Sequence, residues 1–299
     1  MLHQTIACPP ACHPATLVNI DRFPDGLAYC AQLLLATHVE LQRECRYVAD
    51  QQRWLLSHVA TAIHFEHQIT PSAMPLTPAS LFKALGEAKI ASRNTVTMFL
   101  KEMQRYGFCA SLTVGDKRKR ALRVTTMAEQ LICRYFDIHL RALDMIDGGQ
   151  RQATLEKHPE LLSYAQPLFA REIVAQETWY EPPVSIAQLT RSNSGSSILH
   201  ELALGVPRDL TGAGTQIWVG KIALGALAKR YGLSKTHTAY LLETARLTRS
   251  IGWVKEGNHN NYWISPDTVR DYRSWQALKL ATIAKAFWEG CILLKVDPA

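Results

Sequence analysis

The amino-acid sequence predicts a mainly α-helical chain with small β-hairpins, and three observations lead to this fold class. Apolar residues recur at three- and four-residue steps along most of the 299 residues, which is the period of an amphipathic helix. Two segments instead place short apolar runs on either side of a polar tip, which is the pattern of a hairpin. The same order of helices, turn and hairpin occurs twice, which predicts an internal repeat.

The first part of the chain is expected to combine an irregular arm with packing helices. Four prolines fall within residues 1–24, and no periodicity is visible there. From Leu27 to about Ile63 apolar residues recur at helical spacing, which predicts core or dimer-interface helices. Pro71 and Pro75 end this region.

A compact block follows, in which capping residues mark two helices. Thr77 is predicted to be the N-cap of a helix, with the proline that follows it at the first helical position. This helix is expected to reach Leu85. Ser92 is placed to cap a second helix that runs to Arg105, and Gly107 is placed to end it. This second helix carries an apolar stripe, so its opposite face is expected to be polar.

The block continues with a hairpin and a further helix. Short strands are predicted at Phe108–Val114 and Ala121–Thr125, on either side of the basic tip Gly115–Arg120. A helix is then predicted from Met127 to about residue 145. Residues 147–214 are expected to form a helical connector.

A second block of the same order follows the connector. Val219–Tyr231 is predicted to be a helix, and Ser234 is placed to cap a helix over Lys235–Arg249 that ends at Gly252. The remaining predicted elements are strands at Trp253–Lys255 and Tyr262–Ser265, a tip at Glu256–Asn261, and a helical region over 267–294.

The two blocks align at an offset of 142 through their central helices, which places Phe82 on Leu224. Aligning the helix stops Gly107 and Gly252 requires three additional residues in the second block. The match lies more in pattern than in identity.

Helix, turn, capped helix, stop and hairpin in this order are typical of a winged helix-turn-helix. The predicted architecture is therefore mainly α with small β-hairpin wings, in the form of tandem winged helix-turn-helix domains. The first domain is expected over residues 25–146 and the second over residues 215–299.

Positive charge is concentrated in the two blocks. The chain has 33 Lys/Arg and 26 Asp/Glu residues, for a net charge of +7. Leu76–Thr125 holds ten Lys/Arg against three Asp/Glu, and Thr215–Ser265 holds seven against two. This distribution indicates a polyanion as partner.

The composition is typical of a globular protein of the cytoplasm. Seven scattered cysteines are an odd number, which argues against a disulfide framework and for a reducing compartment. The N-terminal residues lack the basic and apolar regions of a signal peptide. No apolar run reaches about eighteen residues, so no membrane contact is expected.

The capped helix of each block is expected to enter the major groove of double-stranded DNA, which is about 12 Å wide, while the wing contacts phosphates. The expected DNA contacts of the first block are Ser92, Arg93, Asn94, Thr95, Thr97 and Lys101 on the helix, and Lys117, Arg118, Lys119 and Arg120 on the wing. Those of the second block are Ser234, Lys235, Thr236, His237, Thr238, Tyr240 and Lys255.

Simpler interpretations of these residues stay open. An ordinary solvated helix face accounts for the same polar side chains. The second block is equally suited to dimerisation or protein contact, because its wing carries Lys255 beside Glu256. Trp54, His58 and Tyr135 are better explained as core residues than as the lining of an effector pocket.

No cofactor or metal is expected. Cys8, Cys12 and His13 lack the second pair of ligands that a structural zinc site needs, and His64 with His67 is an ordinary pair on one helix face. The sequence also contains no phosphate-binding glycine loop, dinucleotide fingerprint or nucleophile elbow. We therefore expect a binding protein and not an enzyme.

Four segments carry a resemblance to a known family: Leu81–Leu85, Ser92–Thr97, Met103–Phe108 and Gly115–Arg120. Through these segments residues 76–145 resemble the MarR-like regulators (multiple antibiotic resistance regulators), and residues 27–145 do so loosely. The resemblance implies binding to double-stranded DNA, usually as a homodimer, and often regulation by a small-molecule effector. The second block shares the order of elements but has a different wing.

The leading hypothesis is a bacterial-type, sequence-specific transcriptional regulator that binds DNA through both winged-helix units. One alternative is a plasmid-type replication initiator, since tandem winged helices are similar to that class as well. Another is a protein-interaction scaffold, because winged helices also serve as docking modules.

Overall fold

The structure is mainly α-helical with two small antiparallel sheets, as the sequence predicts. The computed structural model describes residues 9–112, 121–210, 214–257 and 259–298. The chain divides into two compact units, each built from segments that are distant in the sequence. Unit 1 comprises residues 1–23, 58–175 and 276–299, and unit 2 comprises residues 24–57 and 176–275.

This division differs from the consecutive domains that the sequence suggested. The expected connector 147–214 is divided after Ala175, so that part of it belongs to each unit. Two long helices, α4 (Gln51–Ile69) and α15 (Pro266–Leu294), also contribute to both units. Periodicity marks where a helix lies but does not say which helices share a core, so the grouping could not be read from the pattern.

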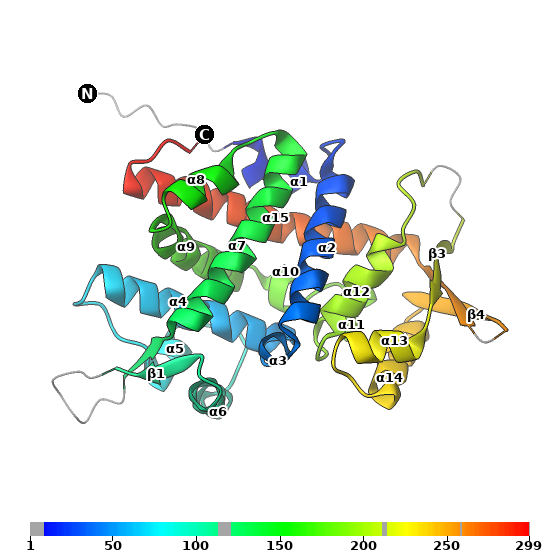
Figure 1. Ribbon diagram of the computed structural model, residues 1–299, viewed down its shortest axis with the longest axis horizontal. Coiled ribbons are helices and arrows are strands. Elements are labelled where there is room, and N and C mark those ends of the chain that lie inside the picture. Colours follow the sequence, from blue (N-terminus) through cyan, green and yellow to red (C-terminus); the bar gives the residue numbers. More distant parts are fainter. Residues whose placement is uncertain (1–8, 113–120, 211–213, 258, 299) are drawn as a thin grey trace. The chain divides into compact units, whose positions relative to one another are not determined.

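Unit 1 is helical apart from a two-stranded sheet, in which β1 (Cys109–Ser111) pairs with β2 (Leu122–Val124). Figure 1 shows β1 beside α6, and α5 also packs on α6. The helical elements of unit 1 are the turn Pro10–Cys12, α1 (Pro14–Leu17), the second part of α4, α5 (Pro78–Ala84), α6 (Arg93–Arg105), α7 (Thr126–Asp147), α8 (Arg151–Lys157), α9 (Leu161–Ala175) and the second part of α15.

The expectation of an irregular N-terminal arm is wrong for residues 10–17, which form two helical turns. Pro10 and Pro14 each stand at the first position of a turn. The N–H that proline lacks is not needed there, because it would form no hydrogen bond within the helix. Leu17 is fully buried and anchors this segment.

An aromatic cluster fills the core of unit 1. Phe136 and Phe169 pack edge to face at 5.6 Å between ring centroids, and His58 lies 5.1 Å from Phe169. The backbone carbonyl of His58 accepts a hydrogen bond from Nε2 of Gln166 at 2.8 Å. His58 and Tyr135 therefore belong to a packed core, with 5.0 Å between their rings.

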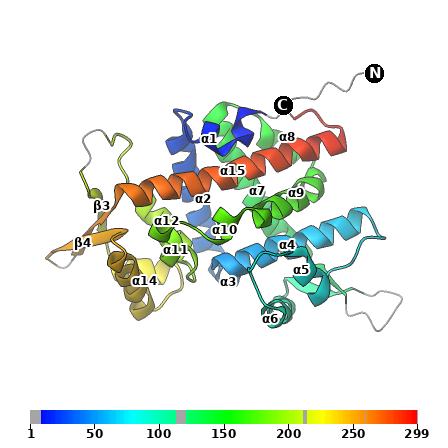
Figure 2. The same ribbon diagram turned by 180° about the vertical axis from the view of Figure 1, so that it is seen from behind.

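Unit 2 combines helices with a three-stranded sheet of order β3-β5-β4, seen from both sides in Figures 1 and 2. Its strands are β3 (Ile217–Ile222), β4 (Ile251–Glu256) and β5 (His259–Ile264). Its helices are α2 (Phe23–Glu40, from Pro24 onward), α3 (Gln42–Arg46), the first part of α4, α10 (Glu177–Tyr180), α11 (Val184–Thr190), α12 (Gly195–Leu204), α13 (Leu224–Arg230), α14 (Lys235–Leu247) and the first part of α15.

The predicted helix Val219–Tyr231 is corrected to a strand followed by a short helix. β3 ends at Ile222 and α13 begins at Leu224. β-branched residues are frequent in the strand, and Ile217 pairs with Ile264, which in turn pairs with Ile251. All three isoleucines are buried, so a cross-strand apolar row decides the conformation here.

Stacked tryptophans mark the core of unit 2. The rings of Trp179 and Trp275 lie parallel at 3.9 Å, and Trp54 packs on Trp179 at 5.3 Å. Trp54 is therefore a packing residue of this unit.

In the part of the chain that the structure describes, no helix combines the length and apolar character needed to cross a membrane.

Two buried histidines predict a loss of stability in mild acid. Burial lowers the pKa of His38 from 6.5 to about 4, and burial with the nearby charge of Lys279 lowers that of His58 to about 3. Both rings are neutral when folded and take up protons on unfolding below pH 6.5. As the pH is lowered from roughly 7.5 to 5, each histidine is expected to reduce the free energy of unfolding by about 2 kcal/mol.

Urea unfolding at these two pH values checks this expectation. H58F keeps a ring between Tyr135 and Phe169 and should remove about 2 kcal/mol of the pH dependence. H259Q, at an exposed position, is the matched control. An H58F protein with the pH dependence of the parent would contradict the prediction.

Candidate nucleic-acid interface

The helix boundaries around α5 and α6 follow the capping residues named from the sequence. Thr77 Oγ1 accepts a hydrogen bond from the Ser80 N–H at 3.0 Å, and Ser80 Oγ accepts one from the Thr77 N–H at 2.8 Å. Ser92 Oγ accepts from the Thr95 N–H at 3.1 Å. Both N-cap predictions are confirmed, and each cap satisfies a donor that the helix itself leaves free.

One face of α6 is buried and the opposite face is exposed. Its buried residues are Val96, Phe99, Leu100 and Met103, which are the apolar stripe seen in the sequence. Arg93, Asn94 and Lys101 are exposed, as expected for groove contacts.

The two threonines of α6 that were predicted to contact DNA are less exposed than Arg93, Asn94 and Lys101. Thr95 and Thr97 are half-buried. The Thr95 hydroxyl hydrogen-bonds with Ser92 Oγ at 2.9 Å, and the Thr97 hydroxyl donates to the Arg93 carbonyl at 2.9 Å. The polar surface of α6 is therefore centred on its arginine, asparagine and lysine side chains.

The cations of α6 have no carboxylate partner in the part of the chain that the structure describes. Among the described residues, none of Arg93, Lys101 and Arg105 forms an ion pair, and all three are exposed. The Arg93 guanidinium lies 4.8 Å from the ring centroid of Phe82, which orients it from α5. These charges remain open to an anionic partner.

Sequence reasoning missed two further exposed cations of unit 1. Arg105 follows Lys101 by four residues, so helical spacing alone could have placed it on the same face. Arg123 is exposed in the middle of β2, where alternation along the strand turns it away from the buried Leu122 and Val124. The predicted wing residues Lys117, Arg118, Lys119 and Arg120 lie outside the described residues.

Unit 2 repeats the capped helix with a different surface. Ser234 Oγ accepts a hydrogen bond from the His237 N–H at 3.1 Å. The exposed residues of the predicted set here are Ser234, Lys235, Thr236, Tyr240 and Lys255, while His237 is half-buried.

The prediction that Thr238 contacts DNA is corrected. Its side chain is 0% exposed, and its hydroxyl donates to the Ser234 carbonyl at 3.0 Å. At the offset of 142 Thr238 takes the place of the buried Val96. A small hydroxyl that bonds within its own helix can occupy an apolar position, so residue polarity was a poor guide to exposure here.

The same offset also holds at the helix stops, without additional residues. Gly107 has φ +82° and Arg249 has φ +57°, so both adopt the left-handed conformation after the helix. The next N–H then bonds back to the helix, from Phe108 to the Met103 carbonyl at 2.8 Å and from Ser250 to the Ala245 carbonyl at 3.1 Å. The stop of the second block is thus Arg249, and the assignment to Gly252 was wrong.

Gly252 instead makes room within the sheet. A Cβ atom there would lie 2.2 Å from the indole of Trp263 on the paired strand β5. The glycine therefore reflects close packing of an aromatic ring on β4.

The first helices of the two blocks follow another offset. α5 begins at Pro78 and α13 at Leu224, which is an offset of 146. Residues 85–92 connect α5 to α6, whereas the shorter segment 231–234 connects α13 to α14. The alignment of Phe82 with Leu224 is therefore wrong, because the turn between the helices is longer in the first block.

In both blocks, residues that precede the first helix pair with the second strand of the hairpin. In unit 2 these residues form β3, and in unit 1 the pairing is the single bridge between Leu76 and Leu122. The Leu122 N–H donates to the Leu76 carbonyl at 2.8 Å. This shared feature had no sequence signal, since one bridge leaves no alternation to detect.

The α14 face carries paired charges and exposed apolar side chains. Arg246 pairs with Glu243 at 3.3 Å and lies 5.0 Å from the Trp253 ring centroid, and Glu243 stands where α6 has Lys101. Tyr240 is 63% exposed and Leu247 is 77% exposed. The two candidate faces thus differ in chemistry although their backbones repeat.

Comparison of the chain with protein-family models, curated proteins and solved structures finds no match. Among the described residues, no group of three or more His, Cys, Asp or Glu side chains is arranged to hold a metal ion.

The matching helix stops predict opposite effects of two substitutions. Gly107→Ala places a Cβ in the left-handed region and should destabilise the chain by about 1 kcal/mol. Arg249→Gly relieves the same strain and should stabilise it by up to about 1 kcal/mol.

Urea unfolding of both variants measures these effects. Gly214→Ala, at an exposed position with open space around it, is the control. Equal signs for the two substitutions would contradict the assignment of Arg249 as the second stop.

Proposed function

We propose that this protein is a sequence-specific transcriptional regulator that binds double-stranded DNA through tandem winged helix-turn-helix units. The observation that carries the proposal is the surface of α6, where an N-capped helix presents Arg93, Asn94, Lys101 and Arg105 with no carboxylate partner among the described residues. An amphipathic helix of this kind can bury one face in its domain and place the other in a major groove.

The neighbouring elements support the same interpretation. Free N–H groups and the positive end of the helix dipole at Ser92 favour a phosphate near the start of α6. Arg93 and Asn94 are chemically suited to read guanine and adenine edges, respectively. The basic segment Lys117–Arg120 joins the two strands that follow α6, and Arg123 adds a cation on β2.

The two units are proposed to bind different partners. Unit 1 is proposed to supply most of the DNA affinity because the cations of α6 form no ion pair within the described ranges. In unit 2 the exposed Tyr240 and Leu247 lie seven residues apart on α14 and share a face with a charge pair. This surface favours protein contact, so docking of a protein on unit 2 is the second candidate function.

The first test is fluorescence anisotropy of the full chain with a random duplex at roughly 50 and 200 mM salt. Micromolar binding that weakens steeply with salt supports the proposal. Absence of binding at the lower salt would reject DNA binding, and a protein partner would then be sought for unit 2.

Neutralising the α6 cations should weaken DNA binding strongly. R93Q/K101Q/R105Q removes three charges and is expected to flatten the salt slope by up to about 2.7, which is about 0.9 for each phosphate that the variant no longer neutralises. R141Q/R171Q/R270Q, which removes three exposed cations of α7, α9 and α15, is the control for net charge. K235Q/R246Q on α14 should have less effect than the α6 variant.

Neutralising the wing tests its role separately from that of α6. K117Q/R118Q/K119Q/R120Q should weaken binding to all duplexes alike and reduce the salt slope by roughly 3 to 4. Base preference, measured by selection from a randomised duplex pool, should stay unchanged because α6 is intact. A wing variant that binds as well as the parent would refute phosphate contact by this segment.

A further inference from the structure

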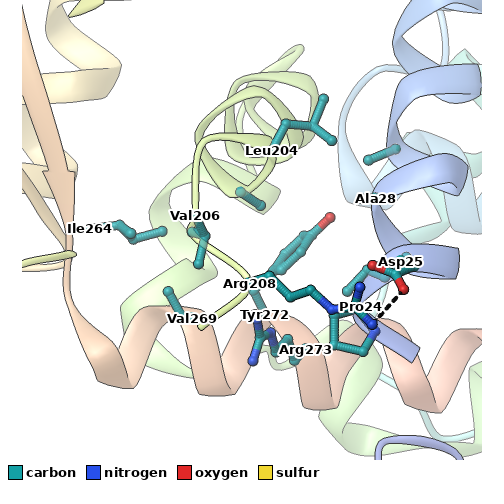
Figure 3. A pocket seen from close by; sticks show the side chains of 13 residues that line it. Pro24, Asp25, Ala28, Leu204, Val206, Arg208, Ile264, Val269, Tyr272 and Arg273 are labelled. Carbon is teal, nitrogen blue, oxygen red and sulfur yellow. Dashed lines mark ion pairs between the residues drawn. The ribbon is translucent and has the colours of Figure 1, made fainter. Parts of the chain in front are cut away.

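Unit 2 contains a small cavity that the DNA-binding surface does not use. Its volume is about 120 Å³, and α2, α12, β5 and the start of α15 surround it (Figure 3). Most of the lining is apolar and includes Leu27, Ala31, Leu204, Val206, Ile264 and Val269. A cavity with these walls is suited to the hydrocarbon part of a small ligand.

Two arginines line the cavity, and among the described residues only one of them has a carboxylate partner. Arg208 forms an ion pair with Asp25 at 2.9 Å, and Figure 3 shows its side chain reaching toward that carboxylate. Arg273 is half-buried on α15 and has no carboxylate partner among the described residues. The nearest acid along its helix, Asp271, accepts a hydrogen bond from Ser185 at 2.6 Å and lies 3.4 Å from Arg270.

Arg273 is therefore partly desolvated without a counter-ion from the residues that the structure describes. Burial lowers the pKa of its guanidinium, but an arginine stays protonated at neutral pH. A guanidinium offers a fork of N–H donors that matches the two oxygens of a carboxylate. The electrostatic gap in this wall is thus of the kind that a ligand carboxylate fills.

The remaining polar group of the wall is already satisfied. The Tyr272 hydroxyl is hydrogen-bonded to Nδ1 of His200 at 2.7 Å, and both residues are buried. Tyr272 consequently contributes its ring to the cavity and leaves recognition of charge to Arg273.

The volume limits the size of the ligand. An apolar cavity of about 150 Å³ accommodates one benzene molecule, so the smaller space here holds roughly four or five carbon atoms. We propose that this cavity binds a short-chain aliphatic carboxylate, with its carboxylate on Arg273 and its tail between Leu27 and Val269.

Such a ligand would contact the root of the unit 2 hairpin. Ile264 lines the cavity and also pairs with Ile217 and Ile251 in the buried row of the sheet. Binding at the cavity does not depend on DNA, so this inference and the proposed function can fail separately.

The test is a titration of the full chain with 3-methylbutanoate in the absence of DNA, in which saturation-transfer NMR measures binding. A saturable signal with a dissociation constant on the order of 1 mM is expected for so few atoms. The neutral 3-methylbutanamide has the same shape and should bind at least about tenfold more weakly. No saturation up to about 20 mM acid, or equal affinity for acid and amide, would overturn the proposal.

Two variants locate the site. R273Q should weaken binding of the acid at least about tenfold, whereas R270Q, which removes an exposed charge paired with Asp267 on the same helix, should leave it unchanged. Ala28→Leu should abolish binding by filling the cavity with a larger side chain. Thermal unfolding verifies that each variant is folded. Equal binding by R273Q and R270Q, or parental binding by the folded Ala28→Leu protein, would reject this site.

Discussion

The turn that ends the second helix of each block is the constraint on which the repeated structure depends. A residue in the left-handed conformation, Gly107 or Arg249, reverses the chain, and the next N–H bonds to a carbonyl one turn back. That same next residue then accepts a hydrogen bond from the start of the following helix. The Thr125 N–H donates to the Phe108 carbonyl at 3.0 Å, and the Ser265 N–H donates to the Ser250 carbonyl at 2.9 Å.

These bonds join the capped helix, the hairpin and the following helix at one point. The hairpin must leave the helix in a defined direction, because both of its ends are tied to the same residue. The polar face of α6 and the strands β1 and β2 are therefore held in one arrangement, and α14 with β4 and β5 repeats it. A surface that has to match a double helix depends on such a fixed relation between helix and wing.

The repeated backbone carries two unlike surfaces. Lys101 in unit 1 corresponds to Glu243 in unit 2, and Glu243 engages Arg246. The first surface offers exposed cations that have no ion pair with any described residue, whereas the second offers Tyr240 and Leu247 to solvent. A common framework with different side chains allows one unit to favour DNA and the other a protein, as the proposed division of labour requires.

Much of the local structure follows from residue types alone. Thr77, Ser92 and Ser234 mark the helix starts because a hydroxyl can accept the free N–H groups, and the apolar stripe of α6 gives its orientation. Arg93, Asn94 and Lys101 were found on the exposed face for this reason.

Features that depend on partners distant in the sequence did not follow from residue types. β3 was mistaken for helix because its pairing with β5 is a long-range contact, and Thr238 was mistaken for a surface residue because the core accepts its internally bonded hydroxyl. Arg249 gave no signal of a left-handed turn, since the conformation is imposed by the bonds around it. The grouping of α4 and α15 into both units likewise reflects which faces pack together, and periodicity carries no information about the identity of the packing partner.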